Sequence, residues 1–111
     1  MDEKGNPNIG PFSCGGVITI ENGSYKITRS GQYWAFAHYS RHVRRGAKVF
    51  STGAAPATGG QLSHVGFRNP DGAHVLVVAN QKTERSVRAQ LGGSCLEFKA
   101  PADSVHTLEW L

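Results

Sequence analysis

The chain has 111 residues, of which 39% are hydrophobic and 18% charged, a composition that indicates one globular domain and excludes a disordered chain. Twelve Lys and Arg against eight Asp and Glu give a net charge of +4, but the basic residues are scattered, so we expect no nucleic-acid partner. No stretch approaches the roughly 18 consecutive apolar residues of a membrane span, so we expect no membrane partner either.

The first thirty residues predict a loop followed by a hairpin. Residues 1–14 are so rich in Gly, Asn and Pro that only turns and irregular loop fit them. The β-branched run 17–20 and the returning run 25–28 flank Asn22 and Gly23, a pair typical of hairpin turns. We therefore predict two short antiparallel strands here.

A helix is predicted for residues 31–45, between the capping residue Ser30 and Gly46. Its apolar and aromatic side chains cover most of the circumference, more than a surface helix needs. They are Tyr33, Trp34, Phe36, Ala37, Tyr39 and Val43. A basic run at the predicted end of the helix fits stabilisation of the helix dipole. It consists of Arg41, His42, Arg44 and Arg45. We expect this helix to need neighbours on two sides and, without them, to drive self-association through its exposed face.

After Gly46 the hydrophobic pattern changes to a period of two, which predicts strands. The predicted strands are 48–50, 64–68, 74–79, 86–91, 95–100 and 105–110. The run 74–79 is apolar on both faces, which is typical of a central strand. In total we predict a mainly β fold, an antiparallel β-sandwich of about seven or eight short strands with one α-helix in the amino-terminal half.

Catalytic and metal-binding patterns are weak. His38 and His42 stand four residues apart on the predicted helix, but they lack a third ligand, so we expect no metal and no cofactor. Cys14 and Cys95 are too few for a disulfide framework and are expected to be free, buried thiols. Ser13 is not surrounded by the Gly-x-Ser-x-Gly pattern of a nucleophile.

Five segments in order carry a resemblance to a known family. They are DEKGNPN, GPFSCGGVITI, GQYWAFAHYSRHVRRGAKV, VGFRNPDGAHVLVVAN and ADSVHTLEW. Together they resemble the carboxy-terminal end of glycoside hydrolase family 30, the glucosylceramidase-like family. The resemblance implies a parent with a (β/α)₈ barrel fused to a side β-sandwich. Residues 1–46 then correspond to the last barrel elements, and residues 47–111 correspond to the accessory sandwich.

The resemblance also implies what this chain lacks. The two catalytic glutamates of the family lie on barrel strands upstream and have no counterpart here. The barrel strand before Asp2 and the short amino-terminal segment that family members add to the sandwich are also missing, so we expect the chain to begin inside a domain of its parent.

We therefore expect a chain that is not an enzyme by itself. Retaining glycosidases need two carboxyl groups about 5 to 5.5 Å apart, whereas the eight acidic residues here fall in loops, in turns and on separate strands. The implied function is that of a non-catalytic carboxy-terminal domain of a retaining O-glycosyl hydrolase, of the glucosylceramidase or endo-β-glycanase type. Its partner is the catalytic barrel, which it braces and to which it supplies a loop at the sugar pocket. The implied location is extracellular or periplasmic.

Carbohydrate contacts have two sources of candidates. By resemblance, Phe12 and Ser13 lie at the rim of the parent's sugar pocket. Aromatic rings also stack on pyranoses, and the candidates of this kind are Tyr33, Trp34, Tyr39 and Trp110. Packing is the commoner role for each of these four rings, because they follow the helix and strand periods. Two alternatives remain open: an independent carbohydrate-binding module, which needs exposed coplanar aromatics, and a small enzyme, which needs paired acids or a metal.

Overall fold

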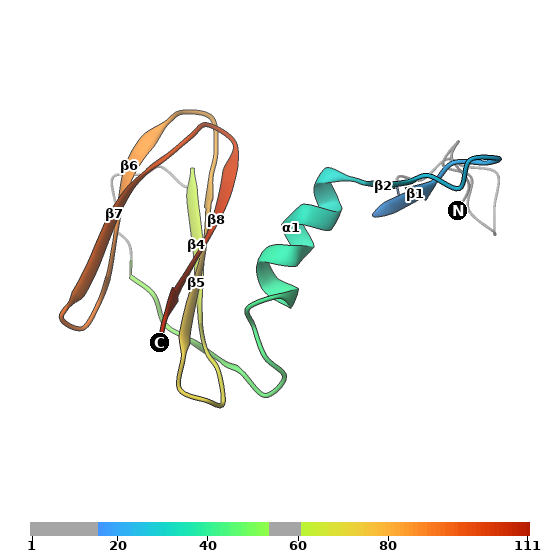
Figure 1. Cartoon of the computed structure of the whole chain (residues 1–111). Helices are drawn as coiled ribbons and strands as arrows, with labels where there is room; N and C mark the ends of the chain where they lie inside the picture. The colour runs from blue at the N-terminus through green and yellow to red at the C-terminus, as the bar shows by residue number, and fades with distance from the viewer. Residues whose placement is uncertain (1–15, 54–60) are drawn as a thin grey trace. The chain divides into compact units, whose positions relative to one another are not determined.

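The computed structural model of the chain describes residues 16–53 and 61–111, shown in Figure 1. It forms two compact units, Met1–Ala37 and His38–Leu111. The predicted sugar contacts Phe12 and Ser13, and the cysteine Cys14, lie outside the described residues. In the described ranges, no helix is long and apolar enough to cross a membrane.

The first unit contains the predicted hairpin. Strands β1 (Ile18–Ile20) and β2 (Ile27–Arg29) pair antiparallel, with Ile20 opposite Ile27. The connection is longer than the turn predicted at Asn22 and Gly23. The backbone N–H of Glu21 donates to the carbonyl of Lys26 at 3.0 Å, and Gly23 has a φ of 92°. Glycine adopts this left-handed conformation without steric cost, so the hairpin closes through a wider loop.

Helix α1 (Gly31–Ser40) begins as predicted but ends five residues before the predicted Arg45. Its first turn is capped by Ser30, whose Oγ accepts from the N–H of Tyr33 at 3.4 Å. After the other end of the helix, the buried side chain of Asn69 binds the backbone in place of further helical hydrogen bonds. Its Nδ2 donates to the carbonyl of His42 at 2.9 Å, and its Oδ1 accepts from the N–H of Arg44 at 2.9 Å.

The basic run therefore lies in the turns just after the helix and not within its last turn. Arg41, His42, Arg44 and Arg45 occupy turns beyond Ser40. The basic residue of the last helical turn is His38. The predicted helix end at Arg45 is therefore wrong, whereas stabilisation of the helix dipole by this run stays a prediction.

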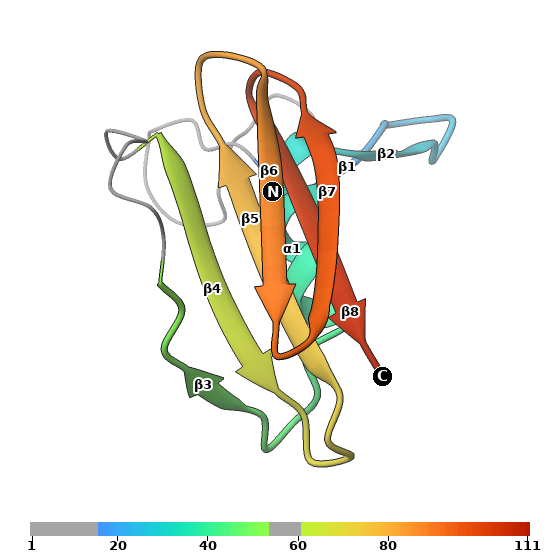
Figure 2. The same cartoon turned by 90° about the vertical axis from the view of Figure 1, so that its left-hand side faces the viewer.

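The second unit is an antiparallel sandwich. A four-stranded sheet has the order β3-β4-β5-β8, and a two-stranded sheet pairs β6 with β7. The strands are β3 (Lys48–Phe50), β4 (Leu62–Arg68), β5 (His74–Asn80), β6 (Arg85–Leu91), β7 (Ser94–Ala100) and β8 (Ser104–Trp110). Figure 2 shows the β6–β7 hairpin in front of one face of the larger sheet. The predicted fold class is confirmed, including the central position of β5.

The core of the sandwich lies between the two sheets. Val78 of β5, Val87 of β6 and Ala100 of β7 form a buried cluster. Leu62, Leu76 and Phe98 pack against this cluster and remain partly exposed. The buried hydrophobic residues that the structure describes are all valine or alanine. Most of them come from β5, whose run from Val75 to Ala79 is apolar throughout, and from β6, which alternates apolar with polar residues.

Gly66 of β4 leaves room for the ring of Phe50 on the neighbouring strand. A Cβ at this position would lie 2.6 Å from Cζ of Phe50 and 2.8 Å from Cγ2 of Thr52. We expect Gly66→Ala to lower the free energy of unfolding by about 1 to 2 kcal/mol, as overpacking does, measured by urea denaturation. Gly93→Ala is the matched control, since nothing lies within 4 Å of its added Cβ. Equal midpoints for the two variants would contradict the prediction.

Candidate functional site

The four aromatic candidates divide between the two units. In the first unit, Tyr33 and Trp34 have ring centroids 5.1 Å apart at 87°, and Trp34 is 57% exposed. In the second unit, the ring of Tyr39 meets the ring of Phe67 edge-on at 6.2 Å, while Trp110 is half-buried at the end of β8. Perpendicular rings such as Tyr33 and Trp34 cannot both lie flat on one sugar face. Their role as sugar contacts stays a prediction.

The histidines of the predicted helix have partners on β8. Nδ1 of His38 lies 2.8 Å from Oγ1 of Thr107, and Nδ1 of His42 lies 3.4 Å from Oε2 of Glu109. Thr107 and Glu109 lie on the same face of their strand, so the two side chains are spaced to meet His38 and His42, which are four residues apart. Together with Asn69, these contacts fix the segment 38–44 on the four-stranded sheet. Across the described ranges, no group of three or more His, Cys, Asp or Glu could hold a metal ion.

Cys95 is free but exposed, so the prediction of a buried thiol is wrong for this residue. It occupies the outer face of β7, because Phe98 and Ala100 of the same strand face the core and Cys95 has the opposite parity. Nε of Arg88 donates to its Sγ at 3.0 Å, and Arg88 also lies 3.9 Å from Glu97. The hydrogen bond with Cys95, then the charges of Cys95 and Glu97, raise the pKa of Arg88.

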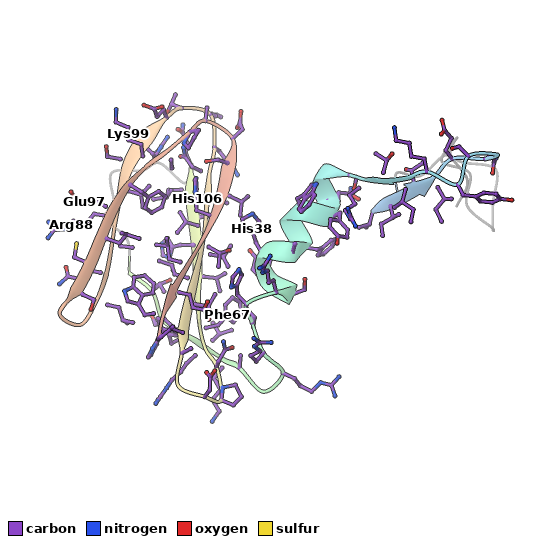
Figure 3. All side chains as sticks on the ribbon, in the orientation of Figure 1. His38, Phe67, Arg88, Glu97, Lys99 and His106 are labelled. Carbon is purple, nitrogen blue, oxygen red and sulfur yellow. The ribbon has the colours of Figure 1, made fainter. Side chains whose placement is uncertain are left out.

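Figure 3 shows Arg88 and Glu97 pointing outward from the β6–β7 hairpin, and His106 directed between the sheets. The ring of His106 lies 4.9 Å from that of Phe98, and its Nε2 lies 2.8 Å from Oγ of Ser104. The acidic side chains Glu97 and Glu109 belong to different strands and each has its own basic partner. Glu97 and Glu109 are therefore held in separate, partly exposed ion pairs.

A groove of about 530 Å³ opens between β6 and the four-stranded sheet. It exists because the two-stranded sheet covers only part of the wider sheet. Its lining combines the end of β3, the inner faces of β4 and β5, and β6 from Ser86 onward. The apolar part of the lining includes Phe50, Leu62, Leu76, Val78, Val87 and Leu91. Sequence reasoning missed this groove, because its walls come from four strands that only the tertiary structure brings together.

The groove is bordered by an open strand edge. Among the strands that the structure describes, β6 pairs only with β7, so the backbone N–H and C=O groups along its other edge have no ladder partner. Such an edge is a template for pairing with another strand. Inside the groove, Oγ1 of Thr52 and Nδ1 of His64 lie 2.6 Å apart. The site is thus a partly apolar cleft beside a strand edge that no other described strand pairs with, and this suits an extended polypeptide better than a small polar molecule.

Comparison with protein families gives one match over most of the sandwich. Residues 46–108 match the model described as the glycosyl hydrolase family 30 β-sandwich domain. This match includes every strand of the second unit from β3 to β7 and most of β8.

Individual relatives agree with the family match. An endo-1,6-β-D-glucanase of Aspergillus fumigatus is 34% identical over 74 residues, and one of Trichoderma harzianum is 37% identical over 79 residues. These alignments cover 64% and 67% of this chain but only 14% and 16% of the two glucanases.

Solved structures match nearly the whole chain. SrfJ from Salmonella typhimurium has a TM-score of 0.90 at 31% identity, and the endo-β1,6-glucanase BT3312 has a TM-score of 0.86 at 26% identity. Both similarities cover 99% of this chain, and they cover 24% and 25% of the solved chains. The chain therefore spans about a quarter of the length of these structures.

Proposed function

This chain belongs to glycosyl hydrolase family 30, through the family's β-sandwich domain, and we propose that it is a non-catalytic accessory part of a retaining glycosidase. In this proposal it braces the catalytic barrel of its parent enzyme. Support comes from relatives that are several times longer than the matched stretch. Glu97 and Glu109, which lie on separate strands and each pair with a different basic residue, agree with a part that does not perform the chemistry.

The names of the relatives suggest the substrate of the parent. Both curated relatives and one of the solved structures are endo-1,6-β-glucanases. We propose that the parent hydrolyses β-1,6-linked glucan. We also propose that it works outside the cytoplasm, because a polymeric substrate of this kind does not cross a membrane.

The observation that carries the bracing role is the exposed apolar face of the first unit. Residues directly opposite in an antiparallel pair share a face, so Ile20 and Ile27 lie together, 52% and 59% exposed, with Ile18 on the same side at 46%. A two-stranded hairpin alone is marginally stable in water. Trp34 and Phe36 of α1 are also exposed, at 57% and 63%. Surfaces of this kind are normally covered, and we propose the barrel as the cover.

The groove beside β6 supports a second point of attachment. The family resemblance implies a short amino-terminal segment of the parent that joins the sandwich. Among the described strands, the edge of β6 away from β7 has no partner, and an apolar groove lies beside it. We propose that the parent's strand pairs with β6 there. Phe12 and Ser13, outside the described residues, keep their proposed role in a loop at the sugar pocket.

The test is a paired assay of the purified chain. Hydrolysis of aryl β-glycosides and of β-1,6-glucan is measured alongside binding to soluble and insoluble β-glucans, galactans and xylans. We expect neither turnover nor binding. Binding without turnover would instead support the independent carbohydrate-binding module, and turnover that survives repurification would overturn the non-catalytic role.

Self-association of the isolated chain follows from the same exposed face. We expect Ile20→Thr combined with Ile27→Thr to weaken association at least about tenfold in sedimentation velocity, because each isoleucine contributes about 1.5 to 3 kcal/mol when fully buried. The matched control is Thr19→Ser with Thr28→Ser, which changes the opposite face of the same pair. A wild-type chain that stays monomeric at high concentration would count against the bracing role.

A further inference from the structure

We propose that the strand accepted by β6 is acidic, with one carboxylate that pairs with Arg85 and another that pairs with Arg88. This inference rests on the proposed function, in which a strand of the parent occupies the groove. It goes beyond that function by stating the chemistry that the strand must have. The reason is the charge of the site: the groove lining contains Arg88 and no carboxylate, and the described hydrogen-bond partners of Arg85 at the end of the groove are neutral. The one carboxylate paired with Arg88 among the described residues, that of Glu97, belongs to β7 on the other side of β6.

Arg85 is the stronger of the two determinants. It has the same parity along β6 as the buried Val87 and Ala89, so its side chain is directed toward the larger sheet. Its Nη2 donates to Oε1 of Gln61 at 2.5 Å and to Oγ1 of Thr83 at 3.0 Å. Its Nε is buried and has no hydrogen-bond partner within the described residues. Both of its partners are neutral, and no ion pair joins it to a described carboxylate.

The position of Arg85 connects it to the groove. It precedes Ser86, the first groove residue of β6, and its partner Gln61 precedes Leu62, a groove residue of β4. A strand bound in the groove would decrease the solvent exposure of the Arg85 guanidinium. A buried charge without a counter-charge is strongly unfavourable, whereas a carboxylate can accept two N–H groups of one guanidinium. A strand with a carboxylate at this end is therefore favoured over a neutral one.

Arg88 adds a second, outward-facing determinant. Its known partners, Cys95 and Glu97, both belong to β7, on one side of β6. The strand that pairs with the other side of β6 would place a side chain directly beside Arg88, and opposite charges in neighbouring strands are favourable. The groove lining itself contains Arg88 and His64 but no carboxylate. Alternation along the strand then places one inward-facing position, opposite Val87, between the two acidic positions, and this residue should be apolar.

The experiment uses the 111-residue chain and capped heptapeptides. The acidic peptide is Val-Thr-Val-Glu-Val-Thr-Glu, which places glutamates opposite Arg88 and Arg85 in an antiparallel pair, and its reversed sequence serves the parallel pair. The matched peptides carry Gln in place of Glu. Binding is measured by NMR titration of the backbone amides of β6 at low and high salt. At low salt we expect the acidic peptide to bind at least about tenfold more tightly than its Gln counterpart. At high salt this difference in affinity should decrease.

Three variants locate the effect. Arg85→Gln and Arg88→Gln are each expected to reduce the advantage of the acidic peptide, and the exposed Arg88 keeps the test valid if Arg85→Gln destabilises the fold. Arg68→Gln, the same change on an exposed residue of β4, should leave the advantage intact. Equal binding of acidic and Gln peptides at β6 would overturn the inference and leave the strand-accepting function standing. No binding of any peptide at β6 would overturn both.

Discussion

Replacing Asn80 with alanine is expected to lower the free energy of unfolding by about 3 kcal/mol, the largest effect of any single change considered. Asn80 is only 1% exposed. Its Nδ2 lies within hydrogen-bond distance of three carbonyl oxygens, those of Thr83 at 2.8 Å, Ala100 at 3.1 Å and Pro101 at 2.8 Å. Alanine would leave these carbonyls without this donor, and an unpaired buried polar group costs about 1 to 3 kcal/mol.

The position of Asn80 explains why one side chain has so large an effect. It lies at the end of β5, and its partners belong to the β5–β6 turn, to the end of β7 and to the β7–β8 turn. It therefore joins the two sheets where the chain crosses between them.

Urea denaturation followed by far-UV circular dichroism measures the effect. Gln90→Ala is the matched control, since the side chain of Gln90 is exposed and, among the described residues, donates to the carbonyl of Gly92 alone, at 3.3 Å. We therefore expect a change within about 0.5 kcal/mol. A loss below about 1 kcal/mol for Asn80→Ala would mean that these contacts do not hold the sheets together.

Replacing Asn69 with alanine is expected to release the segment that follows α1. Asn69 is 3% exposed and bonds both the carbonyl of His42 and the N–H of Arg44. We expect a loss of about 2 kcal/mol in the free energy of unfolding. We also expect faster local opening of the segment around Arg44. The amide of Arg44 should exchange with solvent at least about tenfold faster, because its acceptor is gone and exchange then reports local opening.

Hydrogen exchange measured by NMR tests this release. Asp71→Ala is the matched control in the same turn, because within the described part of the chain its Oδ1 accepts from the N–H of Ala73 alone, at 3.0 Å. It should leave the exchange of Arg44 unchanged. Unchanged exchange in Asn69→Ala would show that the histidine contacts on β8 suffice to hold the segment. In that case the contacts of His38 and His42 with β8, and not those of Asn69, would hold the segment in place.

Sequence patterns predicted the strands well where the period was clear. The runs ending at Arg68, Leu91 and Trp110 each lie in the strand expected of them. The helix end was wrong, because the competing partner Asn69 lies 25 residues away from Arg44 in the chain. The exposure of Cys95 was also wrong, because parity along a strand assigns a face but does not tell which face is covered.

The sequence by itself determined the fold class, the central strand and the family of this protein, because these depend on local periodicity and on residues that are read in order. Only the tertiary structure decided the groove, the open edge of β6, and the environments of Asn80 and Arg85. Each of these arises where strands far apart in the sequence meet. The physical reason is that burial and hydrogen bonding depend on which surfaces face each other, and this is settled only when two sheets of unequal width pack together.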